Sequence, residues 1–521
     1  MSNELATLRA KEEIKKEANE AKEALKAFKK SHKEALSDAN KATLKTLTED
    51  YNLKRDRAIS YGVSFRQDLV DSKTILSVEH LKMFFTYGGD YKTKAVHDIS
   101  FQIKEGECFG LVGESGCGKT TTGRCIMHLY NITSGSIYYK GYRISGGTRW
   151  NEKEIKWSKI HTAEKIKAIK EKEARQLSSL PKDTDLRKEI EAAKKSKDHE
   201  IKELGMMSDD EKEEAISEIS SRYDPTIKEL ETLLKNASLS ESEQAAAIKK
   251  LYSEEIKSLE ENEKKHVYEQ KELIKKIKYD NRHLNRHLMN EIQMIFQDPV
   301  DSLDPRMTVE DIIQEGLHIQ HEYNKAENHQ KCVDMLEKVG LIPEYASRYP
   351  HEFSGGQRQR IGIARALVMN PKMLICDEPI SALDVSIRAQ ILNLLNDVKE
   401  EMGLTIMFIA HDLSVVKYFC DKIAVMYFGN LVELASSDEL FKHPLHPYTK
   451  ALLSAIPKPD PRSEKHRVRK IYNPAKDHDY SVEKPTFQEI VPGHFVLCNS
   501  VEFSKYKEEI SILDQSRGEK K

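Results

Sequence analysis

The chain has 521 residues, of which 32% are charged and 39% are hydrophobic. This length allows two or more domains of ordinary size, and the high share of charged residues indicates long solvated helices beside a normal core. Its 83 lysines and arginines nearly balance its 85 aspartates and glutamates, which leaves a formal charge of −2. A net charge this small produces no overall positive electrostatic field that would attract nucleic acid or anionic lipid, so we expect no nucleic-acid partner.

The cysteines are scattered and form no Cys-x-x-Cys pair, which is typical of a reducing compartment and not of a disulfide framework or a zinc site. The N-terminus lacks the charged-then-apolar pattern of a signal peptide. No apolar run approaches the ~18–20 residues that a membrane-spanning helix needs. If the protein works at a membrane, the sequence predicts that other subunits cross it.

Residues 1–72 are rich in Lys, Glu and Ala and predict a charged helical extension. The apolar residues of its first part are spaced alternately by four and three, as a narrow helical stripe: Ile14, Ala18, Ala21, Leu25 and Phe28. This pattern favours an amphipathic helix that lies on its own protein or on a neighbour. A dedicated recognition arm is the alternative.

An α/β pattern begins at residue 73, where short β-rich runs bounded by glycines appear, and it continues to residue 147. Residues 148–282 are again rich in Lys and Glu with helical spacing, and predict an inserted arm of antiparallel helices. Asp224-Pro225 fits the start of one of these helices.

The α/β pattern resumes over 283–441, with strand-like runs such as Met373–Cys376. Alternating strands and helices predict a mostly parallel sheet. Residues 442–521 remain as a C-terminal tail.

A strand-like run, Cys108–Val112, leads into a segment that matches the phosphate-loop pattern GxxxxGK[ST]. Its glycines let backbone N–H groups converge on phosphates, Lys119 supplies a cation for the β and γ oxygens, and Thr120 offers a hydroxyl to Mg²⁺. The pattern predicts a nucleotide site with these candidate binding residues: Gly113, Glu114, Ser115, Gly116, Cys117, Gly118, Lys119, Thr120 and Thr121.

Two adjacent carboxylates, Asp377 and Glu378, follow the predicted strand Met373–Cys376. Asp377 can hold the metal shell, and Glu378 can reach a water that attacks the γ-phosphate. Adjacent acids at a strand exit are often only a solvated turn. The phosphate loop in the same chain favours the catalytic interpretation.

The segment Phe353-Ser-Gly-Gly-Gln357, followed by Arg358 and Arg360, resembles the signature of the ABC ATPases. The resemblance implies an α/β fold with a RecA-like P-loop core, an antiparallel β subdomain and a helical signature subdomain, beside the inserted helical or coiled-coil arm and the N-terminal extension. It also implies that the signature helix caps the γ-phosphate held by an opposing protomer. The candidate residues are Ser354, Gly355, Gly356 and Gln357.

Other members of the family set stand in order along the chain. Gln297 resembles the Q-loop glutamine, which contributes to catalysis and to the metal shell, and Asp384 ends a segment similar to the D-loop. His411 resembles the switch histidine, which is expected to contact the γ-phosphate and to orient the attacking water. A lone histidine after a strand is usually structural, but its place in this ordered set favours the catalytic role.

Phe85 aligns best with the aromatic residue that stacks on adenine in this family. Phe84 and Tyr87 are alternatives, and a plain core role for Phe85 stays open.

The reaction class is phosphoryl transfer to water, which the family performs between two ATPase domains that sandwich ATP. Because this chain carries one phosphate loop, its partner must be another chain, identical or homologous. The expected cofactors are ATP and Mg²⁺.

Segments near the C-terminus, such as Met426–Glu433 and His443–Thr449, are similar to the oligopeptide/dipeptide importer ATPases, a family that also includes nickel importers. This resemblance implies a complex at the cytoplasmic face of the membrane, with two permease subunits, a homologous ATPase subunit and an external substrate-binding protein. Many members carry a four-cysteine cluster near the C-terminus, but here only Cys498 lies in that region, so we expect no iron–sulfur cluster.

A chromosome-maintenance or DNA-repair ATPase is the main alternative, because those proteins also interrupt the cassette with a coiled coil. Their coil separates the Q-loop from the signature, whereas the present insertion ends before Gln297. The position of the insertion therefore favours transport.

Overall fold

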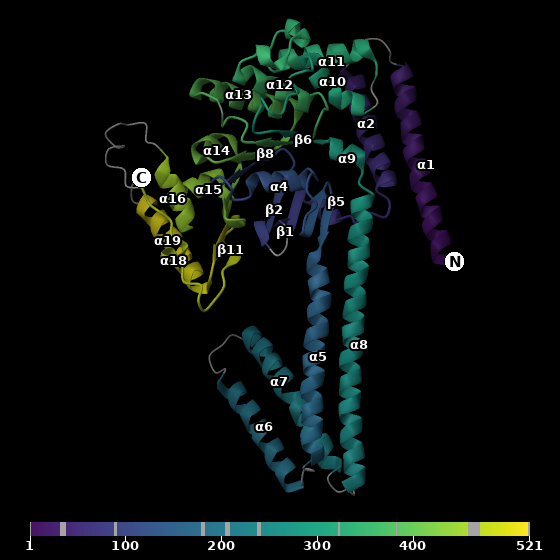
Figure 1. Ribbon diagram of the computed structural model, residues 1–521, viewed down its shortest axis with the longest axis vertical. Coiled ribbons are helices and arrows are strands. Elements are labelled where there is room, and N and C mark those ends of the chain that lie inside the picture. Colours follow the sequence, from purple (N-terminus) through teal and green to yellow (C-terminus); the bar gives the residue numbers. More distant parts are fainter. Residues whose placement is uncertain are drawn as a thin grey trace. The chain divides into compact units, whose positions relative to one another are not determined.

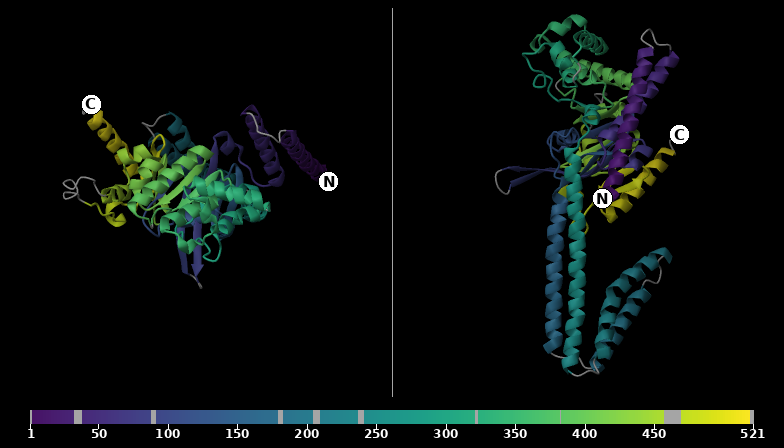
Figure 2. Two further views of the ribbon diagram at one scale, coloured as in Figure 1. Left: turned by 90° about the horizontal axis from the view of Figure 1, so that it is seen from above. Right: turned by 90° about the vertical axis from the view of Figure 1, so that its right-hand side faces the viewer.

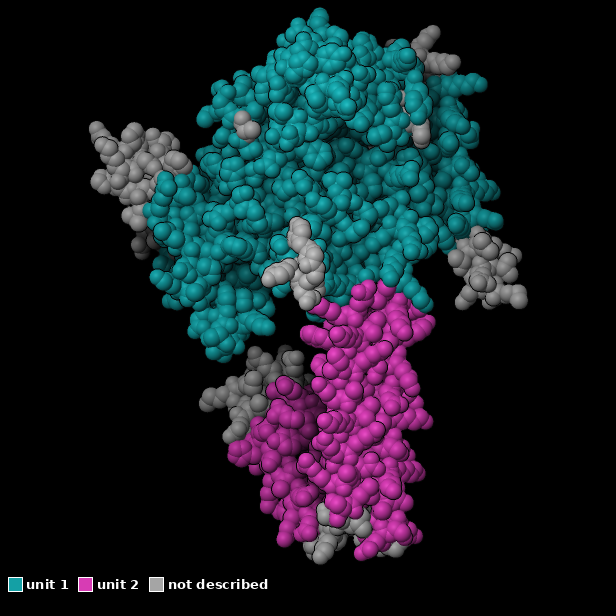
Figure 3. All heavy atoms as spheres, viewed as in Figure 1, with its two compact units in different colours: residues 1–150, 275–521 teal, residues 151–274 magenta. Residues whose placement is uncertain are grey.

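The computed structural model describes residues 2–31, 38–87, 91–178, 183–203, 209–236, 241–320, 323–381, 383–456 and 469–518. The chain forms two compact units, coloured separately in Figure 3. The larger unit comprises residues 1–150 and 275–521, and the smaller one comprises residues 151–274. In the part of the chain that is described, no helix is long and apolar enough to cross a membrane.

An eight-stranded sheet with the order β11-β12-β10-β9-β3-β8-β7-β6 runs through the larger unit (Figure 1). Its strands are β3 (Cys108–Val112), β6 (Ile292–Ile295), β7 (Met373–Asp377), β8 (Thr405–Ala410), β9 (Lys422–Tyr427), β10 (Asn430–Ser436), β11 (Thr486–Val491) and β12 (His494–Cys498). The five strands from β9 to β6 pair in parallel, as the sequence pattern predicts, and the three at the other edge pair antiparallel.

Both faces of the central strands are buried, and successive side chains go to different cores. In β3, Cys108 and Val112 join the core on the helical side, whereas Phe109 and Leu111 join the core on the other side. β7 and β8 alternate in the same way. The continuous apolar runs in the sequence therefore reflect burial on two faces.

A second, antiparallel sheet has the order β2-β1-β4-β5. Its strands are β1 (Thr74–Tyr87), β2 (Tyr91–Lys104), β4 (Ser134–Tyr139) and β5 (Tyr142–Thr148). Its apolar residues, such as Leu76 and Ile137, share one core with Phe109 and Leu111 of the central sheet and with Ile126 of α4 (Lys119–Ile126). The short helix α9 (Arg286–Asn290) leads into β6.

Helices cover the opposite face of the central sheet, and α10 to α13 among them lie above the strands in Figure 1. They are α10 (Val309–Ile319), α11 (Lys325–Lys338), α12 (Gly355–Leu367), α13 (Val385–Met402), α14 (Leu413–Phe419) and α15 (Ser437–Lys442), with the 3-10 turns η1 (Pro343–Ser347) and η2 (Pro350–Glu352). α10, α11 and α12 pack on one another. They form the helical subdomain that the resemblance implies.

The N-terminal extension forms α1 (Ser2–Ser31), α2 (Asp38–Ile59) and the short α3 (Gln67–Asp71). α1 lies beside α2, as Figure 2 shows, and Ala18, Ala21 and Leu25 of the predicted stripe are buried. The amide of Asn285 donates to Asp56 at 3.2 Å in a buried contact. This contact ties the end of α2 to the ATPase core.

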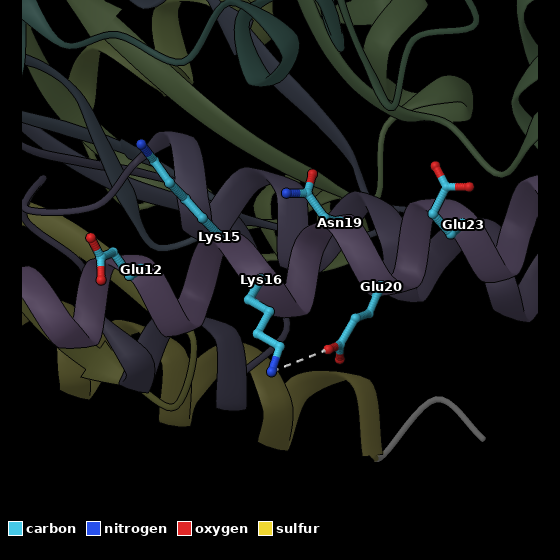
Figure 4. Close-up of a pocket in the computed structure, with 6 residues that line it drawn as sticks. All are labelled: Glu12, Lys15, Lys16, Asn19, Glu20 and Glu23. Atoms are coloured by element: carbon cyan, nitrogen blue, oxygen red, sulfur yellow. Dashed lines mark ion pairs between the residues drawn. The ribbon is translucent and has the colours of Figure 1, made fainter.

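The outer flank of α1 carries a shallow hollow lined by charged and amide side chains (Figure 4). These side chains are exposed and point in different directions, and one ion pair, between Lys16 and Glu20 at 3.9 Å, joins two of them. This flank is a solvated helix surface.

The smaller unit consists of helices, whose full bounds are α5 (Arg149–Ser178), α6 (Asp183–Glu203), α7 (Asp209–Asn236) and α8 (Glu241–Arg282). Its own core contains Leu186, Leu233, Ile248 and Tyr252. The Tyr252 hydroxyl donates to Glu229 at 2.6 Å, and Lys172 pairs with the same carboxylate. The predicted helical arm thus has its own small core.

The prediction that Pro225 begins a helix is wrong, because Pro225 lies inside α7. An interior proline costs roughly 3 kcal/mol through the lost hydrogen bond and the ring clash. Buried apolar residues on both sides of it, Ile219 and Ile227, hold the helix together across this position. Tertiary packing here outweighs a local helix-breaking signal.

The C-terminal tail joins the core sheet. Its hairpin β11–β12 pairs with the edge strand β10, and its helices are α16 (Pro447–Ala455), α18 (Pro474–Asp477) and α19 (Ser500–Gly518). The fully buried carboxylate of Glu433 in β10 accepts hydrogen bonds from the backbone of Leu445 and His446 and from His494 Nε2, at 2.8, 3.0 and 2.9 Å. The tail is therefore anchored to the ATPase domain at one buried acid.

His446 caps α16, since its Nδ1 accepts from the Tyr448 N–H at 3.1 Å. Burial, with His478 and Lys450 nearby, lowers the pKa of His446 from 6.5 to about 3. Between these values the unfolded chain binds the proton and the folded chain does not, so stability is lost as pH falls from 6.5 towards 3, by up to about 1.4 kcal/mol per pH unit.

The variant His446→Asn keeps a capping oxygen and removes the titrating ring. We expect the stability of wild type to fall more steeply between pH 7.5 and 5 than that of the variant, in urea unfolding followed at both pH values. Parallel pH dependence in the two proteins would show that His446 does not titrate on unfolding.

Candidate nucleotide site

Most predicted site residues lie together at the carboxyl ends of the central strands. The phosphate loop follows β3, Asp377 and Glu378 end or follow β7, His411 follows β8, and Gln297 follows β6. These strands are neighbours in the order β3-β8-β7-β6 and run in parallel. Their carboxyl ends therefore bring together residues that are far apart in the sequence.

The phosphate loop has the backbone shape that its glycines allow. Gly118 precedes α4 with φ of +110°, and a Cβ there would lie 2.4 Å from the Ala95 carbonyl oxygen. A Cβ on Gly113 would lie 2.1 Å from the Met426 carbonyl oxygen. Only glycine fits at these two positions. Glu114, Ser115 and Gly116 are exposed, Cys117 is buried, and Thr120 and Thr121 are half-buried at the start of α4.

Lys119 is held inside the loop, with 4% of its surface exposed. Its ammonium donates to the carbonyl oxygens of Gly113 at 2.7 Å and Glu114 at 2.9 Å, and it lies 3.8 Å from Glu378 Oε1. An ammonium has three donors and no acceptor. The cation is thus already oriented within the loop that the phosphates would enter.

Glu378 stands at the centre of the site. Gln297 Nε2 donates to its Oε2 at 3.3 Å, and His411 Nδ1 lies 3.0 Å from the same oxygen. The backbone φ of Glu378 is +45°, in the left-handed region that non-glycine residues rarely adopt. Residues in such strained conformations cluster at active sites. A cavity of about 20 Å³ adjoins Glu378 and His411, a volume sufficient for roughly one water molecule.

Asp377 is almost completely buried beside the phosphate loop, with 1% of its surface exposed. Thr120 Oγ1 donates to Oδ1 at 2.9 Å, whereas Oδ2 is buried without a partner among the described residues. Burial is the main cause that raises the pKa of this carboxyl. A buried acceptor without a donor fits a cation as its partner.

The signature and D-loop residues form a second group. Ser354 and Gln357 make a reciprocal capping box at the start of α12, and Asp384 caps α13 through the Ile387 N–H at 3.0 Å. A Cβ on Gly356 would lie 2.7 Å from the Ile387 side chain, so this glycine lets the two helix starts approach closely, and Gly355 lies beside Leu383. Among the described residues, no hydrogen bond joins this group to the phosphate loop.

Phe85 is half-buried on β1 and packs edge-on against Tyr130, with ring centroids 5.3 Å apart. Phe84 lies within cation–π range of Lys94 and Arg149. The side chain of Tyr87 lies outside the described residues. Phe85 as the adenine-stacking ring stays a prediction, with Phe84, Tyr87 and a plain core role for Phe85 as the alternatives.

Sequence reasoning missed one contact to the site. The Glu114 backbone N–H donates to the hydroxyl of Tyr448 in α16, at 3.0 Å. Tyr448 stands in the His-Pro-Tyr stretch of the tail, which served only as a mark of resemblance. No local pattern connects it to a loop 334 positions away.

The fold and this site define a P-loop ATPase of the cassette type. Residues 96–257 and 256–381 match the family profile described as "ABC transporter", and residues 432–481 match "Oligopeptide/dipeptide transporter, C-terminal region". The chain therefore belongs to the ABC transporter ATPases, in their oligopeptide/dipeptide branch.

Curated relatives agree with that assignment. The chain is 40% identical to "Oligopeptide transport ATP-binding protein OppF" of Bacillus subtilis, over 84% of this chain and 99% of the relative. It is 37% identical to "Oligopeptide transport ATP-binding protein AmiF" of Streptococcus pneumoniae, over 84% and 98%. These matches favour transport over the chromosome-maintenance or DNA-repair alternative.

A solved structure titled "Dimeric Structure of MJ0796, a Bacterial ABC Transporter Cassette" aligns with 70% of this chain and 98% of its own, at 18% identity and a TM-score of 0.39.

Proposed function

We propose that this chain is the ATP-hydrolysing motor subunit of an importer for oligopeptides. One observation carries the chemistry: Gln297, His411 and Lys119 converge on the carboxylate of Glu378 at the mouth of a phosphate loop. In this arrangement Glu378 acts as the general base for the attacking water, and His411 orients that water and the γ-phosphate. The names of the relatives support oligopeptides as the cargo class.

Mg²⁺ fits the residues beside the loop. Thr120 and the unpartnered oxygen of Asp377 are the oxygen donors that this cation prefers, and Gln297 adds a third oxygen from the segment after β6. The cation supplies charge neutralisation for the β and γ phosphates. These three residues are therefore the proposed metal set.

The second group of residues points to a dimer. Ser354–Gln357 present the N-terminus of α12, whose free N–H groups and dipole favour an anion. Because this helix end makes no hydrogen bond to its own phosphate loop in the described chain, we assign it to the ATP bound by a partner ATPase. The proposed partner is a homologous subunit, so that each ATP is held between two chains.

The remaining partners follow from the family branch: two permease subunits that cross the membrane and an external substrate-binding protein. Permease helices would dock near Gln297, in the surface between the core and residues 309–351, at the cytoplasmic face. Dimer closure around ATP would then move the permeases.

Purification of the tagged chain from membranes, followed by mass spectrometry, tests this assembly. We expect two permeases and a second ATPase to co-purify, with ATP turnover stimulated by peptide and binding protein. Recovery of nucleic acid without any membrane protein would contradict the proposal, and stimulation by a nickel chelate alone would change the cargo class.

We propose that the helical arm contacts a partner ATPase or another cytosolic protein. Asn151 Nδ2 donates to Gln270 Oε1 at 2.8 Å, so α5 and α8 lie side by side at the start of the smaller unit. A short glycine linker between residues 151 and 270 can therefore replace the arm.

We expect this deletion to leave the ATP affinity of the chain within about twofold of wild type and to weaken recovery of one partner in the membrane purification. A linker of doubled length serves as the matched control for strain. Unchanged assembly and transport in both variants would mean that the arm is functionally silent.

A further inference from the structure

Tyr448 reaches the back of the phosphate loop from the C-terminal tail. Its hydroxyl accepts a hydrogen bond from the Glu114 N–H at 3.0 Å, and the residue is 2% exposed. The ring packs against Tyr427 and Tyr472, with centroids 4.5 and 5.5 Å away. Burial raises the pKa of the hydroxyl, so it stays neutral and offers a lone pair to the N–H at physiological pH.

This hydrogen bond bears on Lys119 through a single peptide group. The Gly113 carbonyl and the Glu114 N–H belong to the same planar trans peptide and point in opposite directions. The carbonyl accepts from Lys119 Nζ at 2.7 Å, while the N–H donates to Tyr448. A rotation of this peptide breaks both contacts together. Glycine restricts its own backbone dihedrals less than other residues do, so a contact from outside the loop is needed to prevent this rotation at Gly113.

The tail holds Tyr448 rigidly enough to serve as that lock. The Tyr448 N–H is bound by His446 Nδ1, and the backbone of His446 is bound by the buried Glu433. Glu433 belongs to β10, and the turn before β10 also touches the loop, since the Gly429 N–H donates to the Cys117 carbonyl at 2.9 Å. Tyr448 and the phosphate loop are thus both attached to the hairpin of β9 and β10.

We propose that Tyr448 is a positioning residue of the ATP site, whose hydroxyl fixes the Gly113–Glu114 peptide and thereby the Lys119 ammonium. The inference rests on the proposed role of Lys119 in binding phosphates. It makes the C-terminal region a working part of the nucleotide site and gives a reason for a tyrosine, rather than any large apolar residue, at this position.

The variant Tyr448→Phe in the full-length chain removes one oxygen and keeps the packed ring. We expect the Kd for the Mg²⁺ complex of the non-hydrolysable analogue AMP-PNP, and the KM for ATP, to rise about three- to tenfold, the effect of one lost hydrogen bond at a part-buried N–H. The kcat at saturating ATP should stay within about twofold, because bound phosphates then hold the loop. Tyr472→Phe removes a hydroxyl from the same aromatic layer and should change neither constant.

A merely structural role for Tyr448 gives the opposite pattern: a lower Tm and a lower kcat from fewer active molecules, with KM unchanged. That pattern, or wild-type constants in Tyr448→Phe, would overturn the inference. The same AMP-PNP titration distinguishes failure of the proposed nucleotide site from failure of the proposed role of Tyr448. Failure of wild type itself to bind AMP-PNP would overturn the nucleotide site as a whole, whereas wild-type binding that Lys119→Ala weakens and Tyr448→Phe leaves intact would overturn only the role of Tyr448.

Discussion

Replacing Glu378 by Gln should lower ATP turnover by about 10²- to 10⁴-fold while leaving ATP affinity within about threefold of wild type. The amide has the shape of the carboxylate and can still present an oxygen to Gln297 and His411, which contact Oε2 at 3.3 and 3.0 Å. It cannot take a proton from water. Chemistry is therefore lost while the bound geometry persists.

The closed dimer gives an independent readout of the same variant. With ATP bound and not hydrolysed, Glu378→Gln should accumulate ATP-bound complexes with closed ATPase pairs, seen by size-exclusion chromatography with light scattering. Glu107→Gln is the matched control, because Glu107 lies at the opposite end of β3, where it pairs with Lys422 at 3.3 Å. Turnover above about a tenth of wild type in Glu378→Gln would assign the general base to another group.

The central fold was predictable because it depends on local patterns that agree with one another. Four of the five parallel strands, β3, β6, β7 and β8, are short, mostly apolar runs with a chemistry-bearing residue beyond the carboxyl end, as with Lys119 after β3 and His411 after β8. Parallel pairing then brings these residues to one edge without any further information. The catalytic roles of these residues stay predictions, but their convergence on Glu378 is a property of the fold.

Other features depend on contacts that no local pattern encodes. Pairing of β12 with β10 makes the tail part of the core sheet, although the intervening sequence predicts only a separate segment. Pro225 stays inside α7 because packing on both sides outweighs its helix-breaking tendency. The contact between Tyr448 and the phosphate loop depends on the placement of α16 by the buried Glu433, which composition and spacing do not show.

Loss of Lys119 should have an even broader effect than loss of Glu378, because it acts on binding as well as on chemistry. In Lys119→Ala the β and γ phosphates lose their positioned cation, and we expect ATP affinity to fall by about 10²-fold or more, given several charge-assisted hydrogen bonds at roughly 1.5–3 kcal/mol each. Turnover should become undetectable at ordinary ATP concentrations. Calorimetric titration with Mg²⁺ and AMP-PNP measures the affinity directly.

Lys119→Arg separates charge from shape at this position. The ammonium sits in a site that is 4% exposed and donates to two carbonyl oxygens at 2.7 and 2.9 Å. A planar guanidinium is larger and cannot reproduce those two contacts, so the arginine variant should lose binding nearly as fully as alanine. Lys372→Ala, at an exposed position before β7, should bind as wild type. Wild-type affinity in Lys119→Arg would mean that positive charge alone suffices, and the preformed carbonyl cradle would then have no role in ATP binding.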